Sequence, residues 1–235
     1  MHSWFRCGSC IAVLLLSTAS FARQYDPDLR LPLTWPRGTY GFPRALTGCP
    51  RHAWSTGWRY HDTEDSNPAN QWSNPLHLYA SYGSNNVRHY FCMKTTSNED
   101  SYDWSFPRGK YCIYKKGPCP SGLQEGLIHW DDEDNNNRNS HDGVLPDGNY
   151  NRNTDISFCC RTDGDASQPI YLPTDRPFIL FANDPSCQAV HGMSVSREFF
   201  RWDTEDNNNA DRSEGSAPTI GPNWLRLTFC YYYTH

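Results

Sequence analysis

The stretch WDDEDNN at residues 130–136 occurs twice more in altered form, as HDTEDSN at 61–67 and as WDTEDNN at 202–208. A cysteine in a turn-forming sequence precedes each copy, and a Phe-Cys pair follows it. Self-similarity at a regular period is the sequence signature of a repeat architecture. The three stretches therefore predict a chain built from three copies of one unit of roughly seventy residues.

The segments that end in Phe-Cys alternate between apolar and other side chains. Leu225, Leu227 and Phe229 would share one face of a strand in this way. Three such repeats, each too polar to bury an apolar face alone, predict one core shared around a pseudo-threefold axis. We expect an all-β, loop-rich, disulfide-bonded fold that resembles a β-prism. A β-trefoil is the alternative, although its repeats are shorter.

The first 22 residues have the pattern of a signal peptide. Arg6 closes a short polar region, Cys10 to Leu16 is apolar, and small residues stand before position 23. The apolar run is well below the roughly 20 residues that cross a bilayer. We expect a secreted, extracellular protein with a signal peptide at 1–22, a short segment at 23–34 and a single domain at 35–235. The repeats would span roughly 35–105, 106–169 and 170–235.

The chain has ten cysteines, two of which lie in the expected signal peptide. An even remainder in an exported chain favours disulfides over metal binding. Spacing suggests one bridge in each repeat and one between the two cysteines left over, namely Cys49 with Cys92, Cys119 with Cys159, Cys187 with Cys230, and Cys112 with Cys160. Closing a loop of about 40 residues stabilises a fold by roughly 4 kcal/mol. The pairing is an inference, because eight cysteines allow about 105 connectivities.

The formal net charge is −5 and no basic stripe is present, which argues against a nucleic-acid partner. The acidic runs are candidates for a Ca²⁺ site, since dense oxygen ligands suit that ion. The candidate ligands are Asp62, Glu64, Asp65, Asp131, Glu133, Asp134, Asp203, Glu205 and Asp206. Tight turns stabilised by Asp and Asn side chains would give the same pattern, and we favour this structural explanation. No cofactor is therefore expected to be required.

Aromatic and cationic side chains near these loops could bind a sugar, because rings stack on its apolar face and guanidinium groups clamp carboxylates. Aromatic residues at equivalent positions of the repeats, such as Trp130 and Trp202, are expected in the core. Residues without an equivalent are better ligand candidates. The predicted ligand-binding residues are Trp54, Arg59, Trp72, Trp104, Arg138 and Arg201.

Catalysis is not expected. A glycosidase needs two carboxylates of different character across a cleft, and nothing in the acidic runs distinguishes one carboxylate from another. The nucleophile elbow and the zinc-binding helix motif of hydrolases do not occur in the sequence.

The chain resembles the C-terminal domain of apextrin, called ApeC. The strings that carry this resemblance are WPRGTYG at 35–41, FCMK at 91–94, WDDED at 130–134, LPDG at 145–148 and FCCR at 158–161. The resemblance implies an extracellular protein of invertebrates, with members linked to binding of bacterial peptidoglycan and its fragments. Other members are linked to eggs and extracellular matrix. Relatives with a pore-forming domain carry it before this one, and residues 23–34 are too short for it, so membrane insertion is not expected.

The resulting hypothesis is a non-enzymatic pattern-recognition protein of innate immunity that binds bacterial surface glycan, most plausibly peptidoglycan, and is capable of self-association. The alternative is a structural component of an extracellular matrix or egg envelope. Repeat-equivalent groups would then be scaffold, and function would depend on positions where the copies differ.

Overall fold

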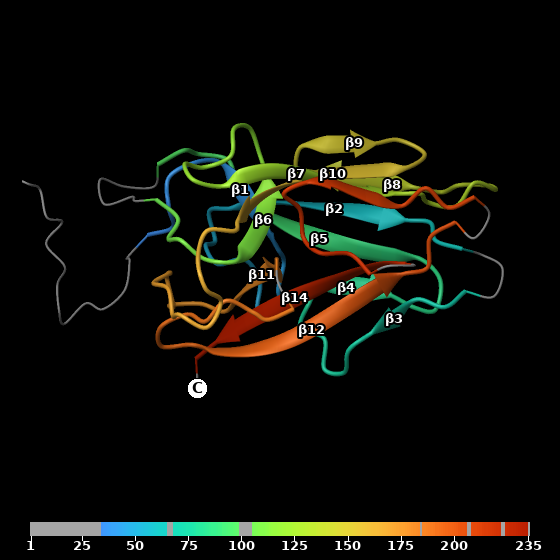
Figure 1. Cartoon of the computed structure of the whole chain (residues 1–235). Coiled ribbons are helices and arrows are strands. Elements are labelled where there is room, and N and C mark those ends of the chain that lie inside the picture. The colour runs from blue at the N-terminus through green and yellow to red at the C-terminus, as the bar shows by residue number, and fades with distance from the viewer. Residues whose placement is uncertain are drawn as a thin grey trace, which may run out of the picture. The chain divides into compact units, whose positions relative to one another are not determined.

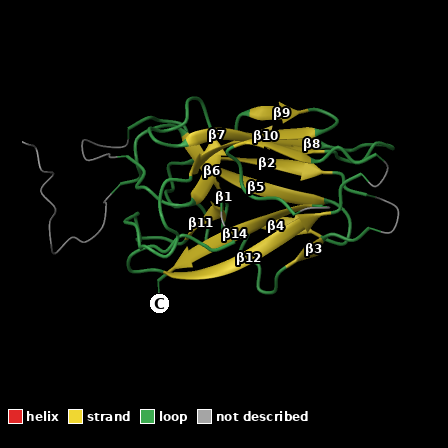
Figure 2. Cartoon of the chain, viewed as in Figure 1, coloured by secondary structure: helices red, strands yellow, loops and turns green. Residues whose placement is uncertain are grey.

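A computed structural model describes residues 34–64, 68–98, 105–183, 185–205, 208–221 and 224–234 (Figure 1). They belong to one compact unit that spans residues 31–235. The expected signal peptide at 1–22 and nearly all of the segment at 23–34 lie outside the described residues. Strands and loops account for the whole described part, which contains no helix, as Figure 2 shows. The all-β prediction is confirmed, and no described segment is a helix that could span a membrane.

The described residues form 14 strands that belong to one curled, open sheet. The strands are β1 (Tyr40–Pro43), β2 (Ser55–His61), β3 (Gln71–Trp72), β4 (Ala80–Tyr82), β5 (Val87–Lys94), β6 (Tyr111–Lys115), β7 (Gln124–Trp130), β8 (Ser140–Gly143), β9 (Gly148–Tyr150), β10 (Thr154–Arg161), β11 (Phe178–Ala182), β12 (Ser194–Trp202), β13 (Arg212–Gly215) and β14 (Leu225–Tyr233).

Each repeat contributes one long antiparallel pair, β2–β5, β7–β10 or β12–β14. The pairs share one register, because the Phe of each Phe-Cys faces the equivalent residue of the partner strand. These facing residues are Gly57 with Phe91, Gly126 with Phe158, and Glu198 with Phe229. The second strand of each pair ends just beyond its Phe-Cys, as the alternating sequence predicts.

Three short strands, β1, β6 and β11, lie side by side and connect the long pairs. Their side chains alternate between two hydrophobic cores. Ile179 and Phe181 of β11 face the larger core between the long pairs, whereas Phe178 and Leu180 face a second core that contains the cysteines of three disulfides. A strand buried on both faces reads as a continuous apolar run, which explains the sequence FILFA of β11.

The long pairs exchange edge strands between repeats. Strand β8 of the second repeat pairs with β2 of the first, β13 of the third pairs with β7 of the second, and β3 of the first pairs with β12 of the third. Two of these approaches need glycine, because a Cβ at Gly57 would lie 2.3 Å from the carbonyl oxygen of Val144, and one at Gly126 would lie 2.2 Å from the backbone of Ser216. At the third approach Glu198 replaces glycine, and its carboxylate accepts the backbone N–H of His77 at 2.6 Å.

The structure contains four disulfides, and they join the same cysteines that the spacing predicts. Cys49–Cys92, Cys119–Cys159 and Cys187–Cys230 each close one repeat, and Cys112–Cys160 joins facing residues of β6 and β10. The first three bonds connect loops beside the second core to the long strands β5, β10 and β14, and the fourth links two strands in the larger core.

Candidate functional site

The three acidic runs contact one another through the backbone in a cyclic pattern. The N–H of Glu133 donates to the carbonyl of Asp62 at 2.9 Å, and the N–H of Glu205 donates to that of Asp131 at 2.9 Å. The cycle is completed by Glu64, whose N–H donates to the carbonyl of Asp203 at 2.8 Å. Each repeat thus bonds the preceding one at the same position, so this part of the acidic run serves to join the repeats.

The carboxylate of the first Asp in each run accepts a backbone N–H from a neighbouring repeat. Asp62 accepts from Arg138 at 2.6 Å, Asp131 from Ala210 at 2.8 Å, and Asp203 from Ala69 at 2.7 Å. Within the described residues, no group of three or more His, Cys, Asp or Glu side chains is arranged to hold a metal ion. The candidate ligands Asp65 and Asp206 lie outside the described residues.

Eight residues after each first Asp stands an Asn or Asp that continues this network. The side-chain oxygens of Asn139 and Asn70 accept the N–H of Asp62 and Asp203 at 2.7 and 2.8 Å. In the third repeat the same position is Asp211, which accepts the N–H of Asp131 at 2.8 Å. Burial raises the pKa of Asp211 to about 6, because its charged form is poorly solvated there.

At the centre of the larger core, the ring of His61 contacts those of Trp130 and Trp202 at 5.5 and 6.0 Å between centroids. All three side chains are fully buried, which agrees with the expectation that repeat-equivalent aromatics belong to the core. His61 Nδ1 lies 2.9 Å from Asp132, and His89 packs edge-on against His61. Burial lowers the pKa of both imidazoles, because it penalises their charged form.

Arg59 extends this buried polar cluster towards the surface. Its Nε donates to the hydroxyl of Thr154 at 2.9 Å, and its Nη atoms donate to the carbonyls of Tyr150 and Asn151 at 3.2 and 3.0 Å. Asp132 lies 3.5 Å away and balances the charge. Arg59 therefore fixes the backbone of the β9–β10 turn from beneath.

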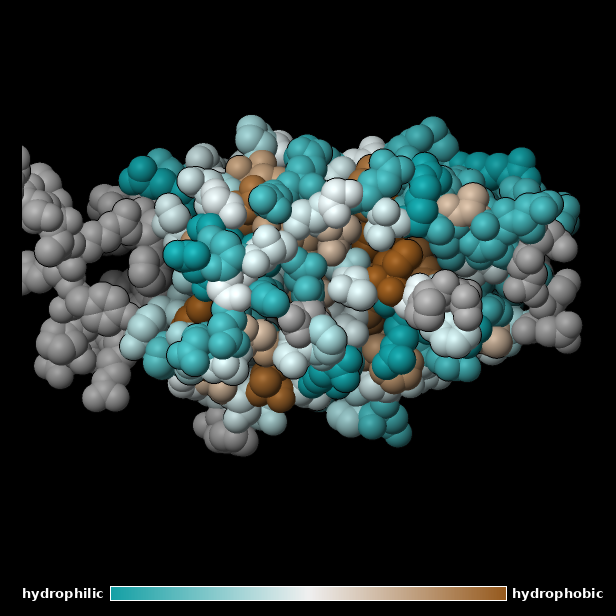
Figure 3. Space-filling view, in the orientation of Figure 1, coloured by the Kyte–Doolittle hydropathy of each residue, from teal (hydrophilic) through white to brown (hydrophobic). Residues whose placement is uncertain are grey.

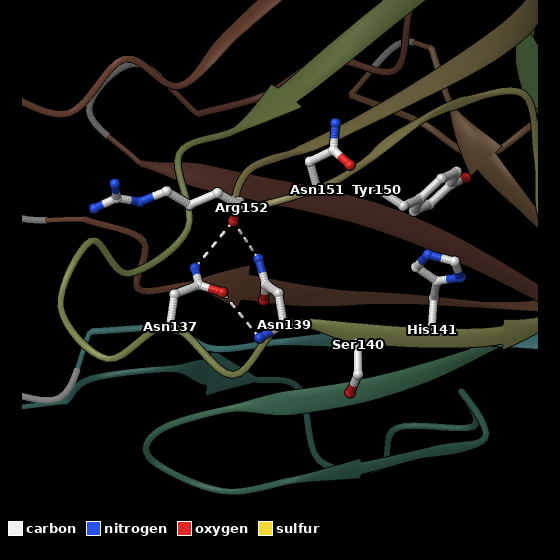
Figure 4. A pocket seen from close by; sticks show the side chains of 7 residues that line it. All are labelled: Asn137, Asn139, Ser140, His141, Tyr150, Asn151 and Arg152. Atoms are coloured by element: carbon white, nitrogen blue, oxygen red, sulfur yellow. Dashed lines mark hydrogen bonds between the residues drawn. The ribbon is translucent and has the colours of Figure 1, made fainter.

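Directly above this turn the surface is hollowed by a cavity of about 560 Å³, which opens to solvent (Figure 4). It lies between the start of β8 and the end of β9, and it is lined by Asn137, Asn139, Ser140, His141, Tyr150, Asn151 and Arg152. Figure 4 shows Asn137 and Asn139 both turned towards the carbonyl of Arg152, to which their amides donate. The rings of His141 and Tyr150 are 5.6 Å apart on the other side. We call this cavity the β8–β9 hollow.

The first repeat fills the equivalent space with an indole. Trp72 stands ten residues after Asp62, as His141 stands ten after Asp131. Its ring stacks on Phe200 at 6.2 Å and contacts Tyr82 at 4.8 Å, as His141 contacts Tyr150. In the third repeat the equivalent residue is Ser213 on β13, which is exposed. The residue at this position of the hollow therefore differs in each of the three copies.

The predicted ligand residues have different positions in the structure. Trp54 is 6% exposed and packs against Tyr40 and Phe42 in the second core, which excludes it as a surface stacking platform. Arg59 is fully buried, so it positions the hollow and has no direct access to a ligand. Both predictions are corrected, because turn proximity in sequence does not reveal which way a side chain points.

Trp104 lies outside the described residues. The other three candidates are at or near the surface. Trp72 is 37% exposed. Arg138 is exposed and lies in the sequence between two residues that line the β8–β9 hollow. Arg201 is half-buried and bonds Asp203 at 3.1 Å. Sequence reasoning missed His141, Asn151 and Arg152, although the Asn-rich sequence after the second acidic run is a signal for them.

A second surface cavity of about 580 Å³ lies beside β13 and is lined by Gln124, Glu125, Thr162, Asn183, Gly215, Ser216 and Ala217. Its lining contains neither an aromatic nor a cationic side chain, so the β8–β9 hollow offers the richer set of contacts for a polar ligand.

These features define a disulfide-bonded all-β protein with a polar, ring-flanked surface hollow. Residues 35–232 match the family ApeC, described as the C-terminal domain of apextrin, and the chain belongs to this family. The resemblance seen in the sequence is confirmed. No curated protein and no solved structure matches the chain. Family membership and the disulfides are in keeping with an extracellular protein.

Proposed function

We propose that the chain is a secreted, non-enzymatic recognition protein that binds bacterial cell-wall glycan, with peptidoglycan as its ligand in innate immunity. The β8–β9 hollow is the single feature that carries this proposal. Its amides, hydroxyl and guanidinium match the hydrogen-bonding groups of a sugar, and its two rings supply apolar contact. An open hollow of this kind holds one or two sugar units of a longer chain at its surface.

The buried support of the hollow strengthens the proposal. Arg59 ties the turn that carries Asn151 and Arg152 to the core, and Asn139 bonds both Asp132 and the carbonyl of Arg152. A recognition site held by fixed backbone loses less entropy on binding than a mobile loop. The polar lining is therefore preorganised, as a weak-binding sugar site requires.

We also infer that the repeats are arranged around a pseudo-threefold axis in a prism-like manner. The cyclic bonds between the acidic runs and the cyclic exchange of β3, β8 and β13 support this arrangement. The scaffold would then be threefold, whereas the β8–β9 hollow is lined by residues of the second repeat. No metal ion is proposed, because the first Asp of each run accepts backbone N–H groups instead.

The test is sedimentation of the purified chain with insoluble peptidoglycan, using chitin and cellulose as competing polymers, in Ca²⁺ and in EDTA. We expect retention on peptidoglycan in both buffers. The variant His141→Trp places in the hollow the side chain that fills it in the first repeat, and we expect at least a tenfold loss of binding. Ser213→Trp adds the same indole at the equivalent exposed position of β13 and serves as the matched control.

Absence of wild-type binding to all three polymers would refute the recognition function and favour the structural matrix alternative. Binding that survives His141→Trp would place the glycan site elsewhere on the surface. Loss of binding in EDTA would instead assign Ca²⁺ a part in recognition.

A further inference from the structure

The outer face of the β12–β14 pair places two arginines opposite each other. Arg201 on β12 faces Arg226 on β14 in the strand register. Residues in this relation have Cβ atoms about 4.5–5.5 Å apart, and like charges there repel. The repulsion is relieved when an anion lies between or above the two guanidinium groups.

Each of these guanidinium groups lies over an aromatic ring, that of Phe199 on β12 or that of Trp224 just before β14. The Cζ of Arg226 is 3.8 Å from the ring centroid of Phe199, and that of Arg201 is 4.9 Å from the ring of Trp224. Stacking on a ring fixes the plane of a guanidinium group and leaves its edge N–H groups available to an acceptor. Trp224 is 42% exposed, so a ligand can also contact its indole.

Within the described residues, the two charges are only partly neutralised. Arg201 has one carboxylate partner, Asp203 at 3.1 Å. Arg226 forms no ion pair within the described part of the chain, and the Nε atoms of both arginines are buried without a hydrogen-bond partner there. On the face of the molecule that Figure 3 draws, hydrophilic and hydrophobic side chains lie next to each other. Among the described residues the two guanidinium groups therefore share one carboxylate partner, that of Asp203.

The other two repeats differ at the equivalent positions. In the first, Arg88 also stacks on a ring, that of Trp58 at 4.3 Å, but it faces Tyr60 across the strands. In the second, Asp155 faces His129 and lies 2.6 Å from its Nδ1. At these equivalent positions of the three long pairs, only β12–β14 has two arginines facing each other.

We propose that this Arg201–Arg226 face binds an anionic group of the cell-wall polymer, a carboxylate of the peptide stem or a phosphate of an attached polymer. The inference rests on the proposed function and adds a second contact to it. Arginine suits either group, because its N–H groups match two oxygens at once. The net charge of −5 disfavours long-range attraction of polyanions, so recognition at this face is of a single group at short range.

The experiment compares three forms of one wall preparation. The first is untreated, the second has its phosphate polymers removed, and the third has its phosphate polymers removed and the carboxylates of its peptide stems amidated. We expect wild-type affinity to fall at least fivefold at the step that removes the recognised group, which identifies it as phosphate or carboxylate. The double variant Arg201→Gln/Arg226→Gln should bind the untreated wall as weakly as the wild type binds the neutralised one, with no further loss on treatment. Arg88→Gln, which removes a ring-stacked arginine at the equivalent position, should behave as the wild type.

Equal wild-type affinity for all three preparations overturns the inference and leaves the proposed function intact. The same holds if treatment of the wall lowers the affinity of the double variant as much as that of the wild type. Absence of wild-type binding to all three overturns both. Thermal unfolding of each variant, with a midpoint close to that of the wild type, excludes a folding defect as the cause of lost binding.

Discussion

Nη2 of Arg59 lies 3.5 Å from Oδ2 of Asp132, and neither side chain is exposed to solvent. The pair is an exception among the repeats, since Ile128 and Phe200 stand where Arg59 does, and Thr63 and Thr204 where Asp132 does. Burial opposes both charges, and the pair persists because each charge also has hydrogen-bond partners, including Thr154, which bonds both. Arg59 belongs to the first repeat, whereas Asp132 belongs to the second repeat, whose residues line the hollow.

We expect Arg59→Ile to lower the free energy of unfolding by about 3–5 kcal/mol, because it leaves the Asp132 carboxylate buried without its main counter-charge. Urea denaturation measures this loss. The double variant Arg59→Ile/Asp132→Thr installs residues found at the equivalent positions, and it should recover at least half of the lost stability. A double variant as unstable as the single one would contradict this explanation.

Acid should destabilise the protein through its buried histidines. Burial lowers the pKa of His61 and His89 in the folded state, so the unfolded chain binds protons more readily below its own pKa of about 6.5. Their contribution to stability is complete above about pH 6.5 and is lost as the pH falls towards the folded-state values.

We expect His89→Leu, the residue at the equivalent position 227, to reduce the loss of stability between pH 7 and pH 5. Urea denaturation at both pH values measures the difference. His141→Ala, which removes an exposed histidine, is the matched control variant. An equal loss in His89→Leu and the wild type would show that the buried histidine does not cause it.

Asp211 should have the opposite pH dependence. Its folded-state pKa of about 6 lies above the ordinary value, so the folded protein holds this proton more tightly than the unfolded chain does. The associated stability is present at low pH and is lost as the pH rises through 6. Asp211→Asn restores the residue found at positions 70 and 139, whose amide bonds Thr63 in the first repeat.

This substitution should raise stability at pH 7 by about 1–2 kcal/mol and add little at pH 4. Thermal unfolding at both pH values provides the measurement. A stabilisation of equal size at the two pH values would exclude the ionisation of Asp211 as its source.

The close approach of β13 to β7 should not tolerate a side chain at Gly126. We expect Gly126→Ala to lower the free energy of unfolding by about 1–3 kcal/mol, since its Cβ would overlap the backbone at Ser216. Gly83→Ala is the matched control, because its Cβ would lie 3.5 Å from its nearest neighbour. Chemical denaturation of both variants tests the contrast, and equal stability would contradict the close packing of the exchanged strand.

Much of the fold follows from the sequence because its strongest signals are local and repeated. Alternation before each Phe-Cys predicts the long strands, and cysteine spacing predicts the disulfides. The exchanged strands were not predicted, since β8 and β13 are exposed throughout and carry no alternation. Their partners lie in another repeat, which a pattern within one repeat cannot reveal.

The candidate site was predictable only in part. The sequence indicated that function would depend on differences between the copies, and the β8–β9 hollow is such a difference. It did not reveal that Arg59 points inwards to Asp132, or that Trp54 fills the second core. Arginine and tryptophan have long amphipathic side chains. Near a loop, such a side chain can point into the core or towards solvent, and the sequence does not tell which.

The exchange of edge strands has a consequence for how the protein resists degradation. Strand β8 completes the sheet of the first repeat, β13 that of the second, and β3 that of the third. When one repeat opens, it withdraws the edge strand that it lends to another repeat. Partial opening therefore also exposes unpaired backbone in the repeat that stays folded. We expect a protein linked in this way to stay closed to proteases until it unfolds as a whole, which would suit an extracellular protein.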